Sequence, residues 1–200
     1  MGKEALSGRD IWQDVSGAKA TVAEQDFFAV FTRALQGTDF QIRPKPKEFK
    51  NIYVNVELPE NVLSQIYNPP EGIRRHGISP DYAIGNTKTG KTLYVEVKRQ
   101  DGWVEGGKRS DGRGNAHERS CKYFTPGLIQ VMREQGKITD TTALPFWTVF
   151  QGDITRDPCR VREITCWYDG FENHFFFWRN TRDNAPLLEH FKHNLMNLLM

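Results

Sequence analysis

Three charged residues near the middle of the chain have the types and spacing needed for phosphodiester hydrolysis. Asp81 follows a proline, and Glu96 and Lys98 lie close together in the segment Leu-Tyr-Val-Glu-Val-Lys. Carboxylates suit Mg²⁺, which usually takes one or two of them from a protein together with phosphate oxygens. A neighbouring ammonium can hold the attacking water or stabilise the charge that develops on phosphorus. The alternative is a solvated ion pair on an exposed strand, with an acidic turn residue nearby.

A β-hairpin over residues 80–98 is predicted to bring these side chains together. Side chains alternate along a strand, so the apolar residues of the second strand face away from Glu96 and Lys98. Turn-forming residues fill positions 86–91 between the two strands. A turn there places Asp81 opposite Glu96 or Lys98. The proline before Asp81 and the charged, glycine-rich stretch after Lys98 favour the catalytic interpretation.

A second group of polar residues lies at positions 112–119, with the sequence Gly-Arg-Gly-Asn-Ala-His-Glu-Arg. Its glycines allow close approach of the backbone to DNA, while Arg113 can bond guanine and Asn115 can bond adenine bidentately. A helix that begins at Asn115 would present such groups to the major groove. The structural alternative is a capped helix with charged residues on its surface. Because it follows the hairpin directly, the segment is predicted to read bases beside a cutting site.

The whole chain, residues 1–200, is predicted to be a single α/β domain with a mixed central β-sheet flanked by helices. Glu24, in the first predicted helix, is either a solvated acid at the helix start or an accessory acid near the metal site. Residues 41–50 are predicted to be an extended basic segment. The predicted helices are 18–35, 61–67, 117–134 (kinked or divided at Pro126) and 187–199, and the predicted strands are 144–150, 161–168 and 173–179, with 51–58 as a further candidate.

Composition and charge indicate a globular protein in which any polyanion-binding surface is local. The chain has 200 residues, of which 38% are hydrophobic and 12% aromatic, so it can bury a sizeable core. The formal net charge of +2 does not by itself indicate a polyanion partner. The 3 cysteines form no Cys-x-x-Cys pair, and no signal peptide or membrane span is evident. We therefore expect a cytoplasmic protein with no membrane association.

Both motifs resemble those of a known group of nucleases. Pro80-Asp81 followed by Glu96-Val97-Lys98 resembles the PD-(D/E)xK signature, and Gly-Asn-Ala-His-Glu-Arg at 114–119 resembles the recognition motif of EcoRI-like type II restriction endonucleases. The resemblance extends over nearly the whole chain and is strongest to the members that cut CAATTG. It implies a PD-(D/E)xK restriction-endonuclease-like core, Mg²⁺ as cofactor, and a homodimer that cuts palindromic double-stranded DNA after the C to leave 5′-AATT overhangs. It also implies a companion methyltransferase that protects host DNA.

The resemblance further implies roles for individual residues. Asp81 and Glu96 would bind the metal, with the Val97 carbonyl as a further ligand, and Lys98 would position the water or steady the transition state. The DNA-binding residues would be Arg113 at the outer base pair, Asn115, Ala116 and Arg119 at the inner AATT, Gly114, and Glu118 as the residue that orients these groups.

Two other functions remain open from the residues themselves. A junction resolvase or repair nuclease would use the same chemistry on a DNA structure, and cleavage of an intact palindromic duplex distinguishes it from a sequence-specific enzyme. A non-enzymatic DNA-binding regulator would need neither Asp81 nor Lys98, so its binding would survive their replacement.

Overall fold

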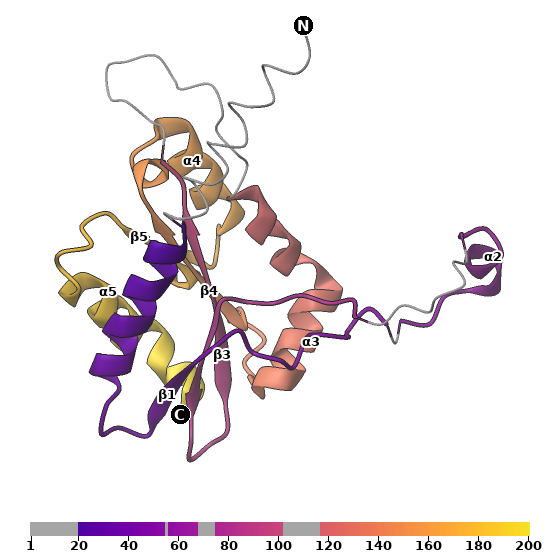
Figure 1. Cartoon of the computed structure of the whole chain (residues 1–200), viewed down its shortest axis with the longest axis horizontal. Helices are drawn as coiled ribbons and strands as arrows, with labels where there is room; N and C mark the ends of the chain where they lie inside the picture. The colour runs from indigo at the N-terminus through magenta and orange to yellow at the C-terminus, as the bar shows by residue number, and fades with distance from the viewer. Residues whose placement is uncertain (1–19, 55, 68–74, 102–116) are drawn as a thin grey trace, which may run out of the picture.

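A five-stranded mixed β-sheet forms the centre of the molecule (Figure 1). The computed structural model describes residues 20–54, 56–67, 75–101 and 117–200. The strands lie in the order β1-β2-β3-β4-β5, antiparallel from β1 to β3 and parallel from β3 to β5. The sheet confirms the predicted mixed α/β fold. Its strands are β1 (Phe40–Pro44), β2 (Tyr82–Asn86), β3 (Thr92–Arg99), β4 (Phe146–Gln151) and β5 (Phe175–Trp178).

Helical segments cover both faces of the sheet (Figure 1). The first is described over residues 20–34. The longer helices that follow are α3 (Pro126–Gly136), α4 (Pro158–Trp167) and α5 (Ala185–His190), the last continued by a π-helical turn η4 (Phe191–Leu195) and a 3₁₀ turn η5 (Met196–Leu199). The shorter ones are α2 (Glu60–Leu63) and the 3₁₀ helices η1 (Glu118–Phe124), η2 (Asp153–Thr155) and η3 (Glu172–His174).

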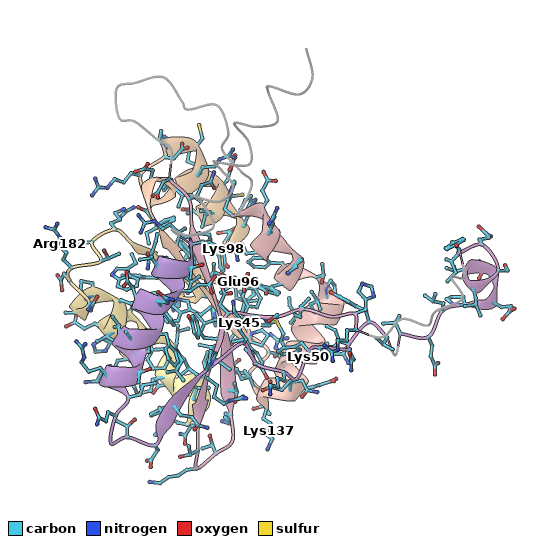
Figure 2. All side chains as sticks on the ribbon, viewed as in Figure 1. Lys45, Lys50, Glu96, Lys98, Lys137 and Arg182 are labelled. Atoms are coloured by element: carbon cyan, nitrogen blue, oxygen red, sulfur yellow. The ribbon has the colours of Figure 1, made fainter. Side chains whose placement is uncertain are left out.

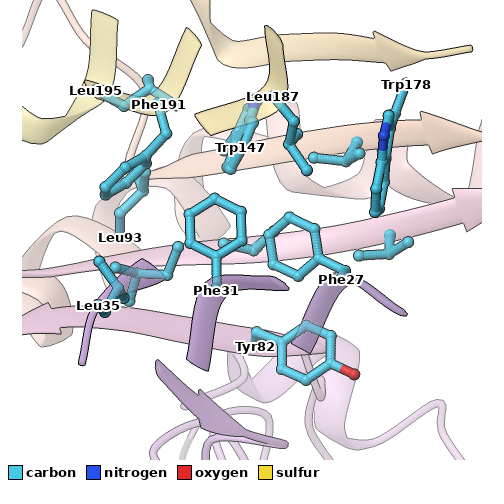
Figure 3. Packing of buried hydrophobic residues seen from close by; sticks show 14 of the residues in the cluster. Phe27, Phe31, Leu35, Tyr82, Leu93, Trp147, Trp178, Leu187, Phe191 and Leu195 are labelled. Atoms are coloured by element: carbon cyan, nitrogen blue, oxygen red, sulfur yellow. The ribbon is translucent and has the colours of Figure 1, made fainter. Parts of the chain in front are cut away.

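The sheet separates two hydrophobic cores, because the middle strands are buried on both faces. On one face, the helix over 20–34 and the C-terminal helices pack aromatic rings over the sheet (Figure 3). There the Phe27 and Phe31 ring centroids are 4.5 Å apart, and those of Phe31 and Phe191 are 5.3 Å apart. On the other face, Tyr94 and Phe146 pack with η1 and α3. As alternation along β3 predicts, Glu96 shares this second face with Tyr94.

The predicted hairpin of β2 and β3 is confirmed, and its turn explains its register. The Asn86 side-chain oxygen accepts a hydrogen bond from the Lys88 backbone N–H at 2.9 Å. Gly90 has φ +71°, a left-handed conformation that glycine adopts without steric cost, and its N–H donates to the Asn86 carbonyl at 2.8 Å. The turn closes the strands so that Tyr82 pairs with Val95. Asp81 therefore lies one position beyond this pair, next to Glu96.

The prediction of a strand over residues 161–168 is wrong, because residues 161–167 belong to α4 and Tyr168 caps its C-terminal end. Pro158 occupies the first turn of that helix, where its missing N–H is not needed. The Asp157 side chain accepts a hydrogen bond from the Cys159 N–H at 3.0 Å and so caps the helix start. The cap at Asp157 and the burial of Ile164 stabilise a helix here. They outweigh the preference of the β-branched residues in this segment for a strand.

The candidate strand over 51–58 is also wrong: residues 51–54 form turns, and the Tyr53 N–H donates to the His76 carbonyl rather than to a neighbouring strand.

The other predicted elements are found in the structure. The extended basic segment predicted over residues 41–50 starts within strand β1. The helix predicted over 117–134 is divided before Pro126 into η1 and α3, as expected. The strands predicted at 144–150 and 173–179 are confirmed as β4 and β5, and the C-terminal helix packs on the core. Within the described parts of the chain, no helix is both long and apolar enough to cross a membrane.

Candidate active site

The hairpin places the two predicted carboxylates side by side. Asp81 and Glu96 are each only 6% exposed. The Val97 backbone N–H, next to Glu96 on β3, donates to Asp81 Oδ2 at 2.9 Å. This contact fixes the orientation of the Asp81 carboxylate relative to β3. The two carboxylates and the Lys98 ammonium are therefore brought together, as the sequence predicts.

Each oxygen of Glu96 has a hydrogen-bond donor. The Lys98 ammonium donates to Oε1, and the Tyr123 hydroxyl donates to Oε2 at 3.0 Å. Burial raises the pKa of Glu96 above its ordinary value, and the negative charge of Asp81 adds to the increase. The positive charge of Lys98 lowers the pKa but only partly offsets these effects. Burial and the Glu96 charge also raise the pKa of Tyr123, which keeps its hydroxyl a donor. The result is a carboxylate held in one orientation from both sides.

A second lysine, Lys45, completes this group and was not predicted to belong to it (Figure 2). Its Nζ lies 2.6 Å from Asp81 Oδ1 and 3.1 Å from Glu24 Oε2. It follows β1, whose pairing of Pro44 with Tyr82 places the next residue beside Asp81. Glu24 thus lies close to the carboxylates through Lys45, which favours the accessory interpretation of Glu24 over a simple solvated acid. Lys45 was missed from the sequence because the pairing of β1 with β2 was not predicted.

The donor set fits a hard divalent cation that keeps most of its water. Asp81 and Glu96 offer oxygen ligands, and two ammonium groups already lie against these carboxylates. In the described residues, no group of three or more His, Cys, Asp or Glu side chains could hold a metal ion. A site with few protein carboxylates is the kind that Mg²⁺ uses when a phosphate completes its coordination.

The helix η1 leads from two predicted DNA-binding residues to the site. Glu118 and Arg119 are both exposed at the first positions of this helix, whereas Tyr123, one turn on, is buried against Glu96. One short helix therefore connects two exposed polar residues to a site carboxylate. The other predicted DNA-binding residues, Arg113, Gly114, Asn115 and Ala116, lie outside the described residues, as does the predicted helix cap at Asn115.

His117 anchors the beginning of η1 to α4, a contact that the sequence motif alone did not reveal. The side chain is fully buried, and its Nε2 lies 3.2 Å from Glu163 Oε2. Its ring stacks on Trp167 at a centroid distance of 5.4 Å. Burial and the charge of Arg160 lower the pKa of His117, against the effect of Glu163. The anchor holds the start of η1 against α4.

Comparisons with known proteins agree with this fold. Residues 1–200 match the family model described as type II restriction enzyme MunI. The chain is 52% identical over 201 residues to the type II restriction enzyme MunI of Mycoplasma sp, with 100% of both chains covered. Its structure resembles the crystal structure of MunI restriction endonuclease in complex with cognate DNA, with a TM-score of 0.81, 50% identity, and coverage of 94% of this chain and 97% of that chain.

The fold and the paired carboxylates with their lysine define a type II restriction endonuclease with a PD-(D/E)xK core. Within this class, the chain belongs to the family of the type II restriction enzyme MunI.

Proposed function

We propose that this enzyme hydrolyses double-stranded DNA at the palindrome CAATTG, cutting after the C to leave 5′-AATT overhangs. The convergence of Asp81, Glu96 and Lys98 on one hairpin carries the proposal, because it supplies the groups that phosphodiester hydrolysis requires. The family supports DNA as the substrate, since a relative was crystallised with its cognate DNA. Hydrolysis joins a water oxygen to phosphorus and breaks one phosphorus–oxygen bond of the backbone.

Asp81 and Glu96 are proposed to hold Mg²⁺, with the Val97 carbonyl as a further ligand. The bound cation would supply positive charge that polarises the scissile phosphate. The Val97 N–H and the Tyr123 hydroxyl orient the two carboxylates from the protein side. The fold therefore sets the directions of the ligand oxygens before DNA is bound, which reduces the rearrangement needed during the reaction.

Lys98 is proposed to act on the reacting atoms themselves. Its ammonium donates to Glu96 Oε1, so the carboxylate directs it toward the site. From this position it would hold the attacking water or stabilise the negative charge that grows on the phosphate oxygens. The side chain is 18% exposed, so it can be reached from solvent.

Base recognition is proposed to come from the segment that ends in η1. Arg119 would contact the inner AATT together with Asn115 and Ala116, where Gly114 allows close approach, and Glu118 would orient Arg119. Arg113 is proposed for the outer base pair. The exposure of Arg119 at the start of η1, with Glu118 exposed beside it, supports this arrangement, because the Arg119 side chain can reach a groove.

We propose that the active form is a homodimer of single-domain chains. A two-fold palindrome is read by a two-fold protein, and a double-strand break needs two active sites. Such an enzyme would act in the cytoplasm beside a companion methyltransferase that modifies the same DNA site without a stable complex. Light scattering at the concentrations used for cleavage tests the dimer, and a monomer that cuts both strands would contradict it.

The proposed specificity is tested with three duplexes that differ only in the target: CAATTG, GAATTC and a scrambled sequence. We expect rapid cleavage of the first in Mg²⁺, with much slower cleavage of the second because its outer base pair differs. Equal cleavage of all three would indicate a structure-directed nuclease. Binding of CAATTG without cleavage, by enzyme that is folded and supplied with Mg²⁺, would indicate a binding protein.

Replacing Arg119 with alanine is expected to weaken specific binding by about 1–3 kcal/mol, the usual loss for one bidentate base contact. Affinity for scrambled DNA should change little. Lys122→Ala is the matched control, since it removes another exposed cation from η1. Fluorescence anisotropy over a salt series measures both effects. An equal loss for specific and scrambled DNA would assign Arg119 to the phosphate backbone.

Replacing Tyr123 with phenylalanine is expected to lower the single-turnover cleavage rate about tenfold while leaving affinity for CAATTG nearly unchanged. A hydrogen bond to a charged group is worth about 1.5–3 kcal/mol, and its loss frees Glu96 Oε2 to change orientation. Tyr53→Phe, which removes a hydroxyl from the same core, serves as the control. Cleavage at the wild-type rate would show that the hydroxyl does not position Glu96.

A further inference from the structure

Lys45 places a positive charge directly between two carboxylates of the active site. Its Nζ contacts Asp81 Oδ1 at 2.6 Å and Glu24 Oε2 at 3.1 Å. Lys98 makes the corresponding contact with Glu96. Each carboxylate that is proposed to bind metal therefore already has an ammonium partner, although only Lys98 belongs to the sequence signature.

The backbone holds Lys45 in this position. Its φ of +43° lies in the left-handed region that side chains other than glycine rarely adopt. The Lys45 N–H donates to the Asp81 carbonyl at 2.9 Å, so main chain and side chain both bond the same aspartate. Strained conformations of this kind persist where the surrounding structure fixes them and are common at functional sites. The placement of the ammonium is thus built into the junction of β1 and the hairpin.

The Lys45 side chain stays protonated and yet remains exposed enough to move. Burial lowers the pKa of the ammonium, and hydrogen bonds and charge from Asp81 and Glu24 more than reverse this, leaving it above its ordinary value. The side chain is 55% exposed, whereas that of Asp81 is 8% exposed. The ammonium can therefore leave the aspartate for solvent without disturbing the core. A half-exposed ion pair also adds little to stability, so stability alone is a weak reason for the strained backbone.

We propose that Lys45 is a resident counter-ion of the active site, which a divalent cation must displace from Asp81, so that Lys45 sets the metal affinity of the enzyme. The inference rests on the proposed role of Asp81 as a metal ligand. In the metal-free enzyme, Lys45 balances the charge of Asp81 and Glu24. When the cation binds, the ammonium swings outward and remains tethered to Glu24.

The test is a calorimetric titration of Ca²⁺ into the intact enzyme without DNA, which reads binding rather than cleavage. A charge within about 4–6 Å changes the proton affinity of a carboxylate by roughly 10- to 1000-fold, and a divalent ion carries more charge than a proton. Lys45→Met should therefore bind Ca²⁺ at least about tenfold more tightly than wild type. Lys45→Gln, which keeps a polar end, should give the same direction of change.

Lys50→Met is the matched control, because it removes the same charge from an exposed position of the same segment (Figure 2). Its Ca²⁺ affinity should equal that of wild type. Adding Asp81→Asn to Lys45→Met should abolish the gain, which places the affected ion at Asp81. A Ca²⁺ affinity of Lys45→Met and Lys45→Gln within twofold of Lys50→Met, or no Ca²⁺ binding that depends on Asp81 in either variant, would overturn the proposal.

Failure of this inference can be told apart from failure of the proposed function. If wild-type enzyme cuts CAATTG in Mg²⁺ but Lys45→Met binds Ca²⁺ no more tightly, only the role of Lys45 is wrong. If wild-type enzyme also fails to cut, the metal-dependent nuclease itself is wrong.

Discussion

Replacing Asp81 with asparagine is expected to lower the rate of DNA cleavage about a thousandfold or more while binding of CAATTG persists. The substitution keeps the shape and an oxygen that can accept the Val97 N–H, but it removes the charge that would hold the metal. A bound metal ion lowers the activation barrier by several kcal/mol, and each step of about 1.4 kcal/mol corresponds to a factor of ten in rate. The loss should therefore fall on the chemical step and spare base recognition.

Single-turnover cleavage and anisotropy with the same duplex measure the two effects separately. Asp39→Asn is the matched control, because that acid forms an exposed ion pair with Lys88 at 2.8 Å, at the far end of the hairpin. It should cut at the wild-type rate. Wild-type cleavage by Asp81→Asn would remove Asp81 from the active site, and a parallel loss of binding would mean that its charge also shapes the DNA-binding surface.

The second large effect is expected for Lys98→Met, with a fall of about 100- to 1000-fold in the single-turnover rate. Removing one group that stabilises developing charge usually costs this much. Glu96 would also lose the charge that opposes the increase of its pKa by burial, so its carboxylate would need a higher pH to ionise. The variant should therefore recover part of its activity as pH rises, beyond any such change in wild type.

Rates across a pH series check both parts of the Lys98 prediction. Lys88→Met removes a lysine that is 74% exposed and should leave the rates unchanged. If Lys98→Met cuts as fast as wild type at every pH, the ammonium has no part in the reaction. If the rate falls without any change in the pH profile, Lys98 acts on the reacting atoms but does not control Glu96.

The hairpin was predictable from sequence because its determinants are local. Alternation fixes which side chains share a face with Glu96, and the residues from Asn86 to Gly90 fix the turn. Together these place Asp81 opposite Glu96 or Lys98, and the pairing of Tyr82 with Val95 in the structure selects Glu96. Division of the helix before Pro126 follows from a similarly local rule.

The position of Lys45 was not predictable in this way, because it depends on pairing between β1 and β2. Its contact with Asp81 spans 36 positions in the chain, and the sequence predicted only that residues 41–50 are extended and basic, not which strand they pair with. The helix α4 was mistaken for a strand because capping by Asp157 and tertiary packing outweigh the propensity of branched residues. The contacts of His117 and Tyr123 likewise join segments whose proximity only the tertiary structure establishes.

The central claim is most directly tested by digesting DNA of known sequence with the purified enzyme and sequencing the ends, in Mg²⁺ and in EDTA. We predict discrete fragments in Mg²⁺ alone, each ending in a 5′-AATT overhang from a cut after the C of CAATTG. Ends scattered without sequence preference, or fragments that form equally in EDTA, would contradict a Mg²⁺-dependent, sequence-specific endonuclease built on Asp81, Glu96 and Lys98.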